Sequence, residues 1–383
     1  MSEVLKVSLD VSAVPDKPAG AGRYIVELAQ RLNARDDISL TVLVRKNDTE
    51  RWVAWLGRDH VVAAIPSARP LRLLFERVFL GRAIARLGAD VHHGPHYTMP
   101  FLKDIPVVVT IPDTTFFDFP EFHEKVKVVF FRRAITRAAV KATRLIALSE
   151  MTARLLKLRV GVEVPVDVVH LGVDLGRFAE ERADDVLRLA ELGVSDGARC
   201  IVFVSTLEPR KGIVELLRAF DGLAATDDTL QLLLVGQRGW GEGLDGTLAT
   251  ITHSDRVRLL GYVDDATLAA VVRSASVVAY PSVAEGFGLP AIEALAASVT
   301  LVTTEGSVME ELVDGAAILA PPSNAAALEQ ALTLALQEAT DAQAVRHAHG
   351  RAVASRYTWE ACVEGHVATY RAAADSNKGR SLR

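Results

Sequence analysis

Short apolar runs alternate with longer segments of helical period along most of the chain, and this alternation limits the fold more than any other feature. Runs rich in Val, Ile and Leu that lack a polar face are typical of parallel strands covered by helices on both sides. We expect such strands near 4–9, 38–44, 61–65, 106–111, 144–148 and 166–170, and a second series near 199–205, 230–236, 256–262, 276–281 and 299–304. The pattern predicts an α/β protein with two parallel sheets.

A charged stretch near 175–198 separates the two series of strands and ends in Gly and Asp residues, as linkers between domains do. The chain has 383 residues, which exceeds the roughly 250 to 300 residues over which a single core keeps growing. We therefore expect two Rossmann-like domains, one over 1–180 and one over 181–355. An amphipathic helix is expected at 356–376, after the second domain.

Composition excludes several classes of protein. The formal net charge is -5, and no long run of Lys and Arg is present, which argues against a nucleic-acid partner. The two cysteines, Cys200 and Cys362, have neither disulfide-like nor zinc-like spacing. Neither a leader-like start nor an apolar run of membrane-spanning length is found, so a cytoplasmic protein is expected.

The segment PSVAEGFGLPAIEALA at 281–296 carries the strongest chemical signal. Gly286 and Gly288 allow backbone amides to approach a ligand closely, and Pro290 suits the first turn of a helix. The start of such a helix presents N–H groups to an anion or a hydroxyl. Glu293, expected in the first helical turn, points back toward the loop that carries Glu285. Two carboxylates at one site favour a ligand rich in hydroxyl groups.

This segment resembles the E-x7-E signature of the family 4 glycosyltransferases, which are retaining enzymes of the GT-B fold. Other stretches resemble the same family in the same order. They are GAGRYIVELAQRL (20–32), HHGPHYTMP (92–100), VTIPDTTFFDFPE (109–121), HLGVDLGRF (170–178), STLEPRKGIVELLRAF (205–220), LLLVGQRGWGEGL (232–244), RVRLLGYVDDATLAAVVRSASVVAYPS (256–282) and GSVMEELVDGAAI (306–318). The resemblance implies two Rossmann-like domains facing across a cleft. It also implies that the C-terminal helix, which contains Trp359, crosses back to the first domain.

The resemblance also implies roles for individual residues. Glu285 would hold the hydroxyls of the donor sugar, and Glu293 those of the ribose. Arg210 and Lys211 would pair with the diphosphate, where preorganised cations stabilise the charge that builds on the leaving group. Asp113 is a further catalytic candidate. The remaining donor-binding candidates are Gly20, Gly22, Ser205, Val263, Gly286, Phe287, Gly288 and Leu289.

The sequence departs from the family pattern in two loops. Many relatives carry a histidine directly before the aspartate that corresponds to Asp113, and here that position is Pro112. Asp113 and His96 remain as polar candidates in the first domain. Ser298 and Thr300 stand where the family usually has Gly and Pro, after the signature helix.

The resemblance implies a retaining, metal-independent transfer, and the sequence contains no Asp-x-Asp triplet for a metal–diphosphate grip. We expect a nucleotide sugar, GDP-mannose in particular, as co-substrate, no further cofactor, and a glycan or lipid-linked acceptor. A non-catalytic nucleotide-sugar-binding protein and a GT-B epimerase or hydrolase remain alternatives. A dinucleotide oxidoreductase is disfavoured, because no G-x-G-x-x-G motif follows the first strand of either domain.

The first half of the chain is basic and the second half acidic. Residues 1–174 carry 25 Lys and Arg against 20 Asp and Glu, whereas residues 175–383 carry 18 against 28. Residues 124–144 (EKVKVVFFRRAITRAAVKATR) mix basic and apolar side chains, and five further arginines lie in 69–86. A helix of this kind can lie on an anionic membrane surface or simply cover a sheet. Peripheral association with the inner face of the membrane is therefore a hypothesis.

Overall fold

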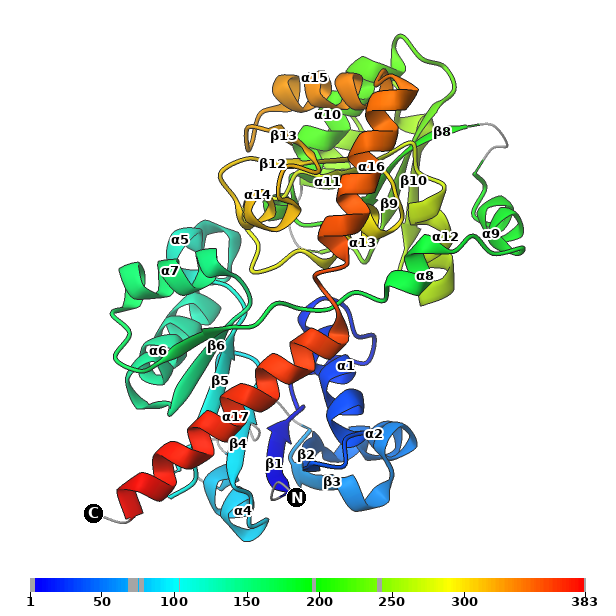
Figure 1. Ribbon diagram of the computed structural model, residues 1–383. Coiled ribbons are helices and arrows are strands. Elements are labelled where there is room, and N and C mark those ends of the chain that lie inside the picture. The colour runs from blue at the N-terminus through cyan, green and yellow to red at the C-terminus, as the bar shows by residue number, and fades with distance from the viewer. Residues whose placement is uncertain are drawn as a thin grey trace. The chain divides into compact units, whose positions relative to one another are not determined.

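A computed structural model of the chain describes residues 4–67, 75, 79–102, 104–194, 198–239 and 243–381. The chain divides into two units (Figure 1). Unit 1 comprises Met1–Leu171 and Trp359–Arg383, and unit 2 comprises Gly172–Thr358. From the sequence, these boundaries are expected at 180/181 and 355/356. The five arginines noted in 69–86 lie partly outside the described residues.

Unit 1 is built on a parallel sheet of seven strands in the order β3-β2-β1-β4-β5-β6-β7. The strands are β1 (Leu5–Asp10), β2 (Ile38–Arg45), β3 (Val61–Ile65), β4 (Val91–Gly94), β5 (Val107–Ile111), β6 (Arg144–Ala147) and β7 (Val166–Val168). The strand order reverses between β1 and β4. The carboxyl ends of these two strands therefore mark the topological switch point, where open α/β sheets bind ligands.

Helices cover both faces of this sheet. They are α1 (Ala21–Asn33), α2 (Thr49–Leu56), α4 (Leu80–Arg86), α5 (Thr115–Asp118), α6 (Lys125–Lys141), α7 (Glu150–Val160) and α17 (Trp359–Ser381). Alternate residues of β5 face opposite sides, as the period of a strand requires. Val107, Val109 and Ile111 share a core with residues of α6 and α7, whereas the Thr110 hydroxyl bonds to Tyr24 of α1.

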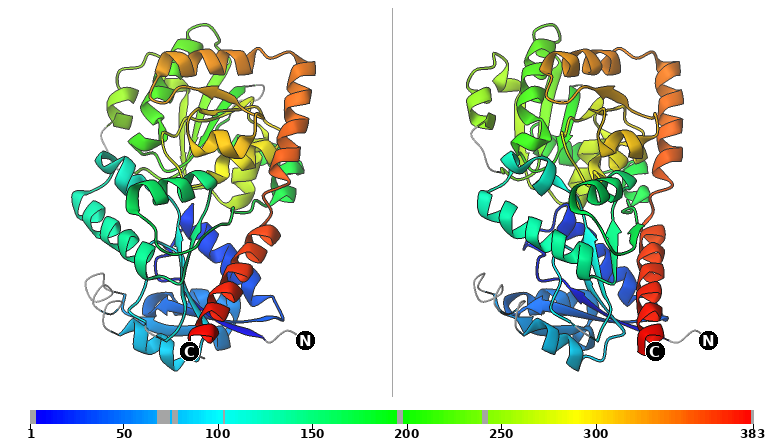
Figure 2. Two further views of the ribbon diagram at one scale, coloured as in Figure 1. Left: turned by 60° about the vertical axis from the view of Figure 1, so that its left-hand side comes forward. Right: turned by 90° about the vertical axis from the view of Figure 1, so that its left-hand side faces the viewer.

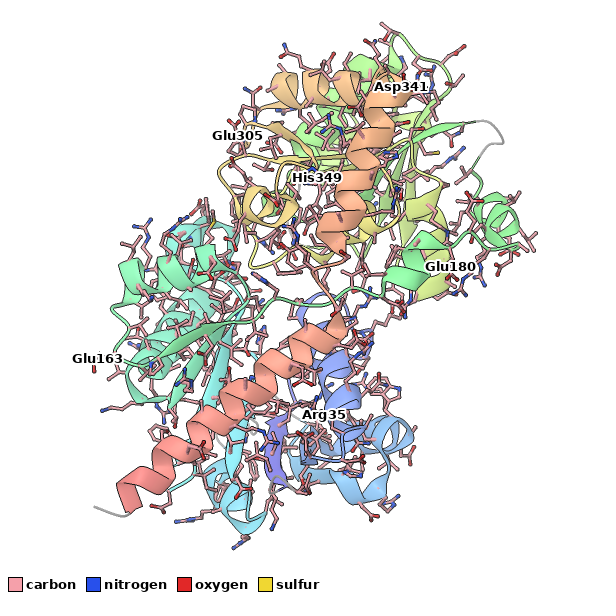
Figure 3. The ribbon with its side chains drawn as sticks, viewed as in Figure 1. Arg35, Glu163, Glu180, Glu305, Asp341 and His349 are labelled. Carbon is pink, nitrogen blue, oxygen red and sulfur yellow. The ribbon has the colours of Figure 1, made fainter. Side chains whose placement is uncertain are left out.

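The C-terminal helix predicted at 356–376 is α17, which continues to Ser381 and belongs to unit 1. It packs against α1, β4, β5 and β6, and it lies along the unit 1 sheet in both views of Figure 2. Ion pairs connect α17 to the segment that follows α1. Arg35, labelled in Figure 3, pairs with Glu364 of α17 and with Asp37, and Arg371 of α17 also pairs with Asp37 (2.8 Å).

A buried polar network joins α17 to the sheet. The Tyr24 hydroxyl lies 2.7 Å from His366 Nε2, and the Tyr370 hydroxyl lies 2.8 Å from His93 Nδ1. Thr110 links the two pairs, since its Oγ1 lies 3.1 Å from the Tyr24 hydroxyl and 2.8 Å from His93 Nε2. All five side chains are buried. Burial lowers the pKa of His366 to about 4 and that of His93 well below its ordinary value, so the network is held by neutral imidazoles.

Unit 2 is built on a parallel sheet of six strands in the order β10-β9-β8-β11-β12-β13. The strands are β8 (Arg199–Val204), β9 (Leu230–Val235), β10 (Val257–Gly261), β11 (Val277–Tyr280), β12 (Leu301–Thr304) and β13 (Ile318–Ala320). The helices are α8 (Leu175–Ala179), α9 (Asp185–Glu191), α10 (Ile213–Ala224), α11 (Gly243–Leu248), α12 (Asp265–Arg273), α13 (Leu289–Ala296), α14 (Val308–Val313), α15 (Ala325–Leu336) and α16 (Thr340–Ala354).

The predicted fold class, two Rossmann-like α/β domains, is confirmed. The sequence pattern did not predict two of the strands, β4 and β13. β4 reads VHHG, so two buried histidines interrupt its apolar run, and β13 has only three residues. In the part of the chain that the structure describes, no helix is both long enough and apolar enough to cross a membrane.

Acid should destabilise unit 1 through His366. In the unfolded chain this imidazole binds a proton near pH 6.5, but in the folded protein only near pH 4. Its contribution to stability is therefore complete above pH 6.5 and is lost as the pH falls toward 4, by up to about 3 kcal/mol. Urea unfolding between pH 7 and 4.5 gives the free energy of unfolding at each pH, and the slope of this free energy against pH measures the effect. His366→Gln should make this slope smaller, leaving the part due to His93, and His349→Gln, at an exposed site, should not change it; equal slopes in wild type and His366→Gln would contradict the assignment.

Candidate active site

Two loops of unit 2 meet at its topological switch point. The strand order reverses between β8 and β11, which pair directly in parallel register. The loop after β8 carries Arg210 and Lys211 in a short 3-10 turn, and the loop after β11 carries Glu285. Because both loops leave the carboxyl ends of adjacent parallel strands, they lie at the same edge of the sheet.

Backbone contacts fix the two loops against each other. Gly212 has φ +72°, and a Cβ there would lie 2.3 Å from the carbonyl oxygen of Pro281. The amide of Val283 donates to the carbonyl of Arg210 at 3.0 Å. Glycine is thus required at 212 both by its left-handed backbone and by the close approach of the second loop.

The loops bring Arg210, Lys211 and Glu285 together. Lys211 forms a close ion pair with Glu285 Oε1, and Arg210 Nη1 lies 3.4 Å from Oε2. Two hydroxyls also donate to Oε1, from Tyr280 at 3.0 Å and from Ser282 at 2.5 Å. Sequence reasoning did not identify Tyr280 or Ser282, although both lie within five residues of Glu285. The sequence contained one signal for them, which was a hydroxyl-bearing side chain at the end of a strand directly before the E-x7-E signature.

The electrostatics of this cluster keep Glu285 ionised. Burial alone would raise the pKa of the carboxyl, but the charges of Lys211 and Arg210 outweigh burial and lower the pKa to about 2. Burial lowers the pKa of Lys211, and the Glu285 charge opposes that shift. The side chains of Lys211, Glu285 and Arg210 are only 9%, 11% and 14% exposed. The cluster is therefore a largely desolvated group of fixed charges.

The glycine-rich turn before α13 has little conformational freedom. Gly288 has φ +99°, and a Cβ there would lie 2.3 Å from the Cε of Met309. α13 begins at Leu289, so Glu293 is the fifth residue of the helix, in its second turn rather than in the predicted first turn. The reason is that the left-handed Gly288 caps the helix and the helix already begins at Leu289, so its first turn is complete before Glu293. Glu293 is 2% exposed and Phe287 is 3% exposed.

The other donor-binding candidates of unit 2 lie along the same edge of the sheet. Gly286 is buried within the turn, and Ser205 directly follows β8, with its amide bonded to the Val235 carbonyl at 3.0 Å. Val263 follows β10 and is half-buried. Because β9 separates β10 from β8, Val263 stands two strands away from the loop that carries Arg210.

Three candidates belong to unit 1. Gly20 precedes α1 with φ +50° and has open space around the position of a Cβ, whereas a Cβ on Gly22 would lie 3.0 Å from Pro15. Asp113 follows β5, and its Oδ1 accepts from the amide of Thr115 at 3.0 Å and from its hydroxyl at 2.7 Å. This oxygen of Asp113 thus holds the start of α5.

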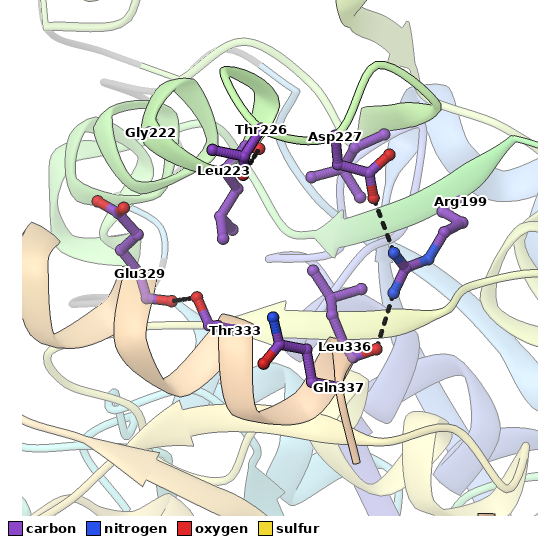
Figure 4. A pocket seen from close by; sticks show the side chains of 10 residues that line it. Arg199, Gly222, Leu223, Thr226, Asp227, Glu329, Thr333, Leu336 and Gln337 are labelled. Atoms are coloured by element: carbon purple, nitrogen blue, oxygen red, sulfur yellow. Dashed lines mark hydrogen bonds and ion pairs between the residues drawn. The ribbon is translucent and has the colours of Figure 1, made fainter. Parts of the chain in front are cut away.

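A separate small cavity lies between α10 and α15 of unit 2 (Figure 4). Arg199 at its rim is already bonded to Asp227 and to the Leu336 carbonyl, each at 2.7 Å. The Glu329 carboxylate covers Gly222, where a Cβ would approach it to 2.6 Å. None of the predicted site residues lines this cavity.

Two family models match the chain. The model described as "Glycosyl transferases group 1" matches residues 189–351, in unit 2, and the model described as "Glycosyltransferase Family 4" matches residues 18–177. Between them they account for most of both units. The match therefore extends well beyond the signature segment.

Individual proteins give the same assignment. The O-antigen chain mannosyltransferase B of Escherichia coli is 27% identical over 92% of this chain and 96% of its own length. Among solved structures, sucrose-phosphate synthase from Thermosynechococcus elongatus has a TM-score of 0.78 at 20% identity, covering 96% of this chain and 98% of its own. The Anabaena protein HepE in complex with UDP-glucose has a TM-score of 0.75 at 18% identity, covering 96% of this chain and all of its own.

The paired Rossmann-like sheets and these similarities define a glycosyltransferase of the GT-B fold. The chain belongs to the group 1 glycosyltransferases of family 4, as its sequence motifs indicate.

The ion pair between Lys211 and Glu285 should show strong coupling in a double-mutant cycle. Lys211→Met leaves a buried carboxylate without its nearest cation, so we expect unit 2 to lose about 3 kcal/mol. Adding Glu285→Gln removes the stranded charge and should restore most of that loss. Urea unfolding measures all four proteins, with Arg258→Met at an exposed site of unit 2 as control. Additive effects of the two substitutions would show that the pair is not an energetic unit.

Proposed function

We propose that the protein transfers a sugar from a nucleotide-diphosphate sugar to a glycan or lipid-linked acceptor, with retention of anomeric configuration and without a divalent metal ion. The observation that carries this proposal is the desolvated cluster of Arg210, Lys211 and Glu285 at the switch point of unit 2. Family membership makes the protein a glycosyltransferase, and the cluster supplies the charges that this chemistry needs.

The cation pair acts on the leaving group. When the bond between the sugar and the diphosphate breaks, both bonding electrons stay with the phosphate oxygen, so negative charge builds there. Arg210 and Lys211, held in place before reaction, stabilise that charge more in the transition state than in the ground state. Arginine offers a planar fork and lysine a point charge, which suits two oxygens of a diphosphate. Two fixed cations can thereby take the place of a metal ion.

Glu285 acts on the sugar. Its Oε1 already accepts from Lys211, Tyr280 and Ser282, whereas Oε2 has the longer contact with Arg210. A carboxylate oxygen accepts about two strong hydrogen bonds, so Oε2 is the atom that would accept from a sugar hydroxyl. The three donors on Oε1 hold the carboxylate in one orientation for that contact.

Retention is supported by the family resemblance. We propose that the acceptor hydroxyl attacks the same face of the sugar that the diphosphate leaves. The new bond joins the acceptor oxygen to the anomeric carbon, and the acceptor proton passes to the departing phosphate oxygen. No side chain is required as nucleophile.

The donor is proposed to be GDP-mannose. Support comes from the Escherichia coli relative, which is named as a mannosyltransferase and matches over nearly its whole length. HepE, which is similar in fold, was solved with UDP-glucose, so a uridine donor is the main competitor. The relative's name refers to the O-antigen chain, which is the basis for proposing a glycan or lipid-linked acceptor.

A donor panel tests this proposal. Wild-type protein should release nucleoside diphosphate from GDP-mannose faster than from UDP-glucose, in the presence of EDTA, and NMR should show a product of unchanged anomeric configuration.

Glu285→Gln should lower kcat at least 100-fold, and Glu293→Ala should raise the donor KM. Glu305→Gln, at an exposed site (Figure 3), should change neither kinetic constant. Release without an acceptor product would indicate a hydrolase, an isomerised donor an epimerase, and binding without turnover a non-catalytic protein. Each of these results would overturn the proposal.

We also propose that unit 1 associates peripherally with the inner face of an anionic membrane through α6. The exposed face of this helix begins with Val126 (79% exposed), Val129 and Phe130 and continues with Arg133. The opposite face, which includes Ile135, is buried in the core. Apolar side chains followed by positive charge match the interface between acyl chains and anionic headgroups, at about 1 kcal/mol per basic residue.

The contacts of Arg137 and Arg132 show which further side chains belong to this surface. Phe101 is 57% exposed, and the Arg137 guanidinium lies 3.3 Å from the centre of its ring, which extends the same mixed character beyond the helix. Arg132, in contrast, donates to the Phe116 carbonyl at 2.7 Å. Arg132 therefore supports its own unit and is not part of the proposed surface.

Liposome flotation tests the membrane proposal. The protein should float with phosphatidylglycerol vesicles at low salt, much less in 0.5 M salt (about a 4 Å Debye length), and not with neutral vesicles. Val126→Ser combined with Phe130→Ser should reduce binding, as should Arg133→Glu, whereas Arg258→Glu, at an exposed site of unit 2, should leave it unchanged. Absence of binding to anionic vesicles at low salt would contradict the proposal without affecting the proposed chemistry.

A further inference from the structure

The loop after β4 places an imidazole at the switch point of unit 1. His96 lies two residues beyond Gly94, the last residue of β4, and β4 pairs with β1 on one side and with β5 on the other. Asp113 lies two residues beyond the last residue of β5. Both side chains therefore belong to the ligand-binding edge of this sheet.

A strained turn fixes the backbone of His96. Tyr97 has φ +64°, a left-handed conformation that is costly for a bulky residue. The Thr98 amide donates to the His96 carbonyl at 2.8 Å, and the Tyr97 amide donates to the Thr110 carbonyl at 3.0 Å. A Cβ on Gly94 would lie 2.2 Å from the Thr98 carbonyl oxygen. Strain of about 1–3 kcal/mol persists only where the surroundings impose it, and such sites are concentrated where ligands bind.

Aromatic rings fix the side chain as well. The His96 ring stands edge-on to the ring of Tyr97 (4.7 Å between centroids) and to that of Phe131 (6.0 Å). Tyr97 itself is buried against Phe116 and Phe131. The imidazole is thus held in an aromatic setting on a backbone that cannot relax.

The imidazole has hydrogen-bonding capacity that its own unit does not use. Within the described part of the chain, neither ring nitrogen of His96 has a hydrogen-bond partner, and neither is sealed from solvent. His93, on the preceding strand, uses both of its nitrogens. Burial lowers the pKa of His96 to about 4, with the Asp113 charge opposing that shift. At neutral pH the ring therefore offers one donor and one acceptor.

We infer that His96 binds a sugar hydroxyl during transfer, an inference that rests on the proposed function. A sugar hydroxyl both donates and accepts, which matches a neutral imidazole. An anion would be repelled by the nearby Asp113 carboxylate, so a phosphate group is disfavoured. Asp113 Oδ1 is committed to Thr115, and Pro112 has no polar side chain. His96 is thus a rigid hydrogen-bonding group at this edge, and it contacts either the donor sugar or the acceptor sugar.

Steady-state kinetics with the nucleotide sugar that the wild type turns over tests this inference. His96→Phe keeps an aromatic ring without nitrogens, and kcat/KM should fall at least 10-fold, while His96→Gln, which can both donate and accept, should recover part of the loss. If the donor sugar is the ligand, the donor KM rises while affinity for the free nucleoside diphosphate is unchanged. If the acceptor is the ligand, the acceptor KM rises and the donor KM is unchanged. His349→Gln should match wild type.

A second measurement uses the wild-type protein and does not depend on the variants folding. Diethyl pyrocarbonate modifies neutral imidazoles, and mass spectrometry reports each histidine separately. The nucleotide sugar, or millimolar methyl mannoside as acceptor probe, should protect His96 and leave His349 reactive. Wild-type kinetics in a folded His96→Phe protein, or equal modification of His96 with and without both probes, would overturn the inference. A wild type that transfers no sugar at all would instead defeat the proposed function.

Discussion

A carboxylate buried between two cations organises unit 2. Glu285 could not remain ionised at this depth without Lys211 and Arg210, and neither cation could be desolvated at low cost without Glu285. The three side chains come from two loops that have no sequence continuity, so the cluster also ties those loops together. Gly212 allows the backbones to approach closely enough for the charges to meet. The position of the charges is therefore a consequence of a backbone contact.

In unit 1, the buried network that joins α17 to the sheet contains no charged group. It consists of neutral imidazoles and hydroxyls, and Thr110 connects those on the sheet with those on α1 and α17. Every member of such a network must be satisfied, because an unpaired polar group in a core costs about 1–3 kcal/mol. The network therefore specifies one docked position for α17 on the sheet. Apolar packing alone would tolerate small shifts along the helix.

Much of this architecture can be predicted from the sequence, and the exceptions have identifiable causes. Runs such as LQLLLV reveal their strands because they are buried on both faces. β4 does not, because His92 and His93 occupy interior positions where an apolar residue is expected, and their partners Ser8, Thr110 and Tyr370 come from distant parts of the chain. Pairings over such separations cannot be deduced from local pattern.

The residues of the candidate site also divide into those that can be predicted from the sequence and those that cannot. Glu285, Arg210 and Lys211 could be proposed from motifs, because their spacing within each loop is short and characteristic. Tyr280 and Ser282 could not, because their role depends on which oxygen of Glu285 they reach. The strain at Tyr97 leaves no trace in the sequence either, since tyrosine is not a residue that suggests a left-handed backbone. Motifs predict which residues meet, whereas orientation and strain require the three-dimensional structure.

The loop after α13 shows how a departure from the family pattern is accommodated. Ser298 stands where the family usually has glycine, and its φ of +57° is the conformation that glycine favours. A left-handed backbone costs a non-glycine residue roughly 1–2 kcal/mol. The Ser298 hydroxyl accepts from Arg351 of α16 at 2.8 Å, and the nearby Thr300 hydroxyl lies 3.1 Å from His347 Nε2 of the same helix. Neither bond would be possible with Gly and Pro, so the strain is offset by side chains that attach α16 to the end of the signature helix, away from the charges at its start.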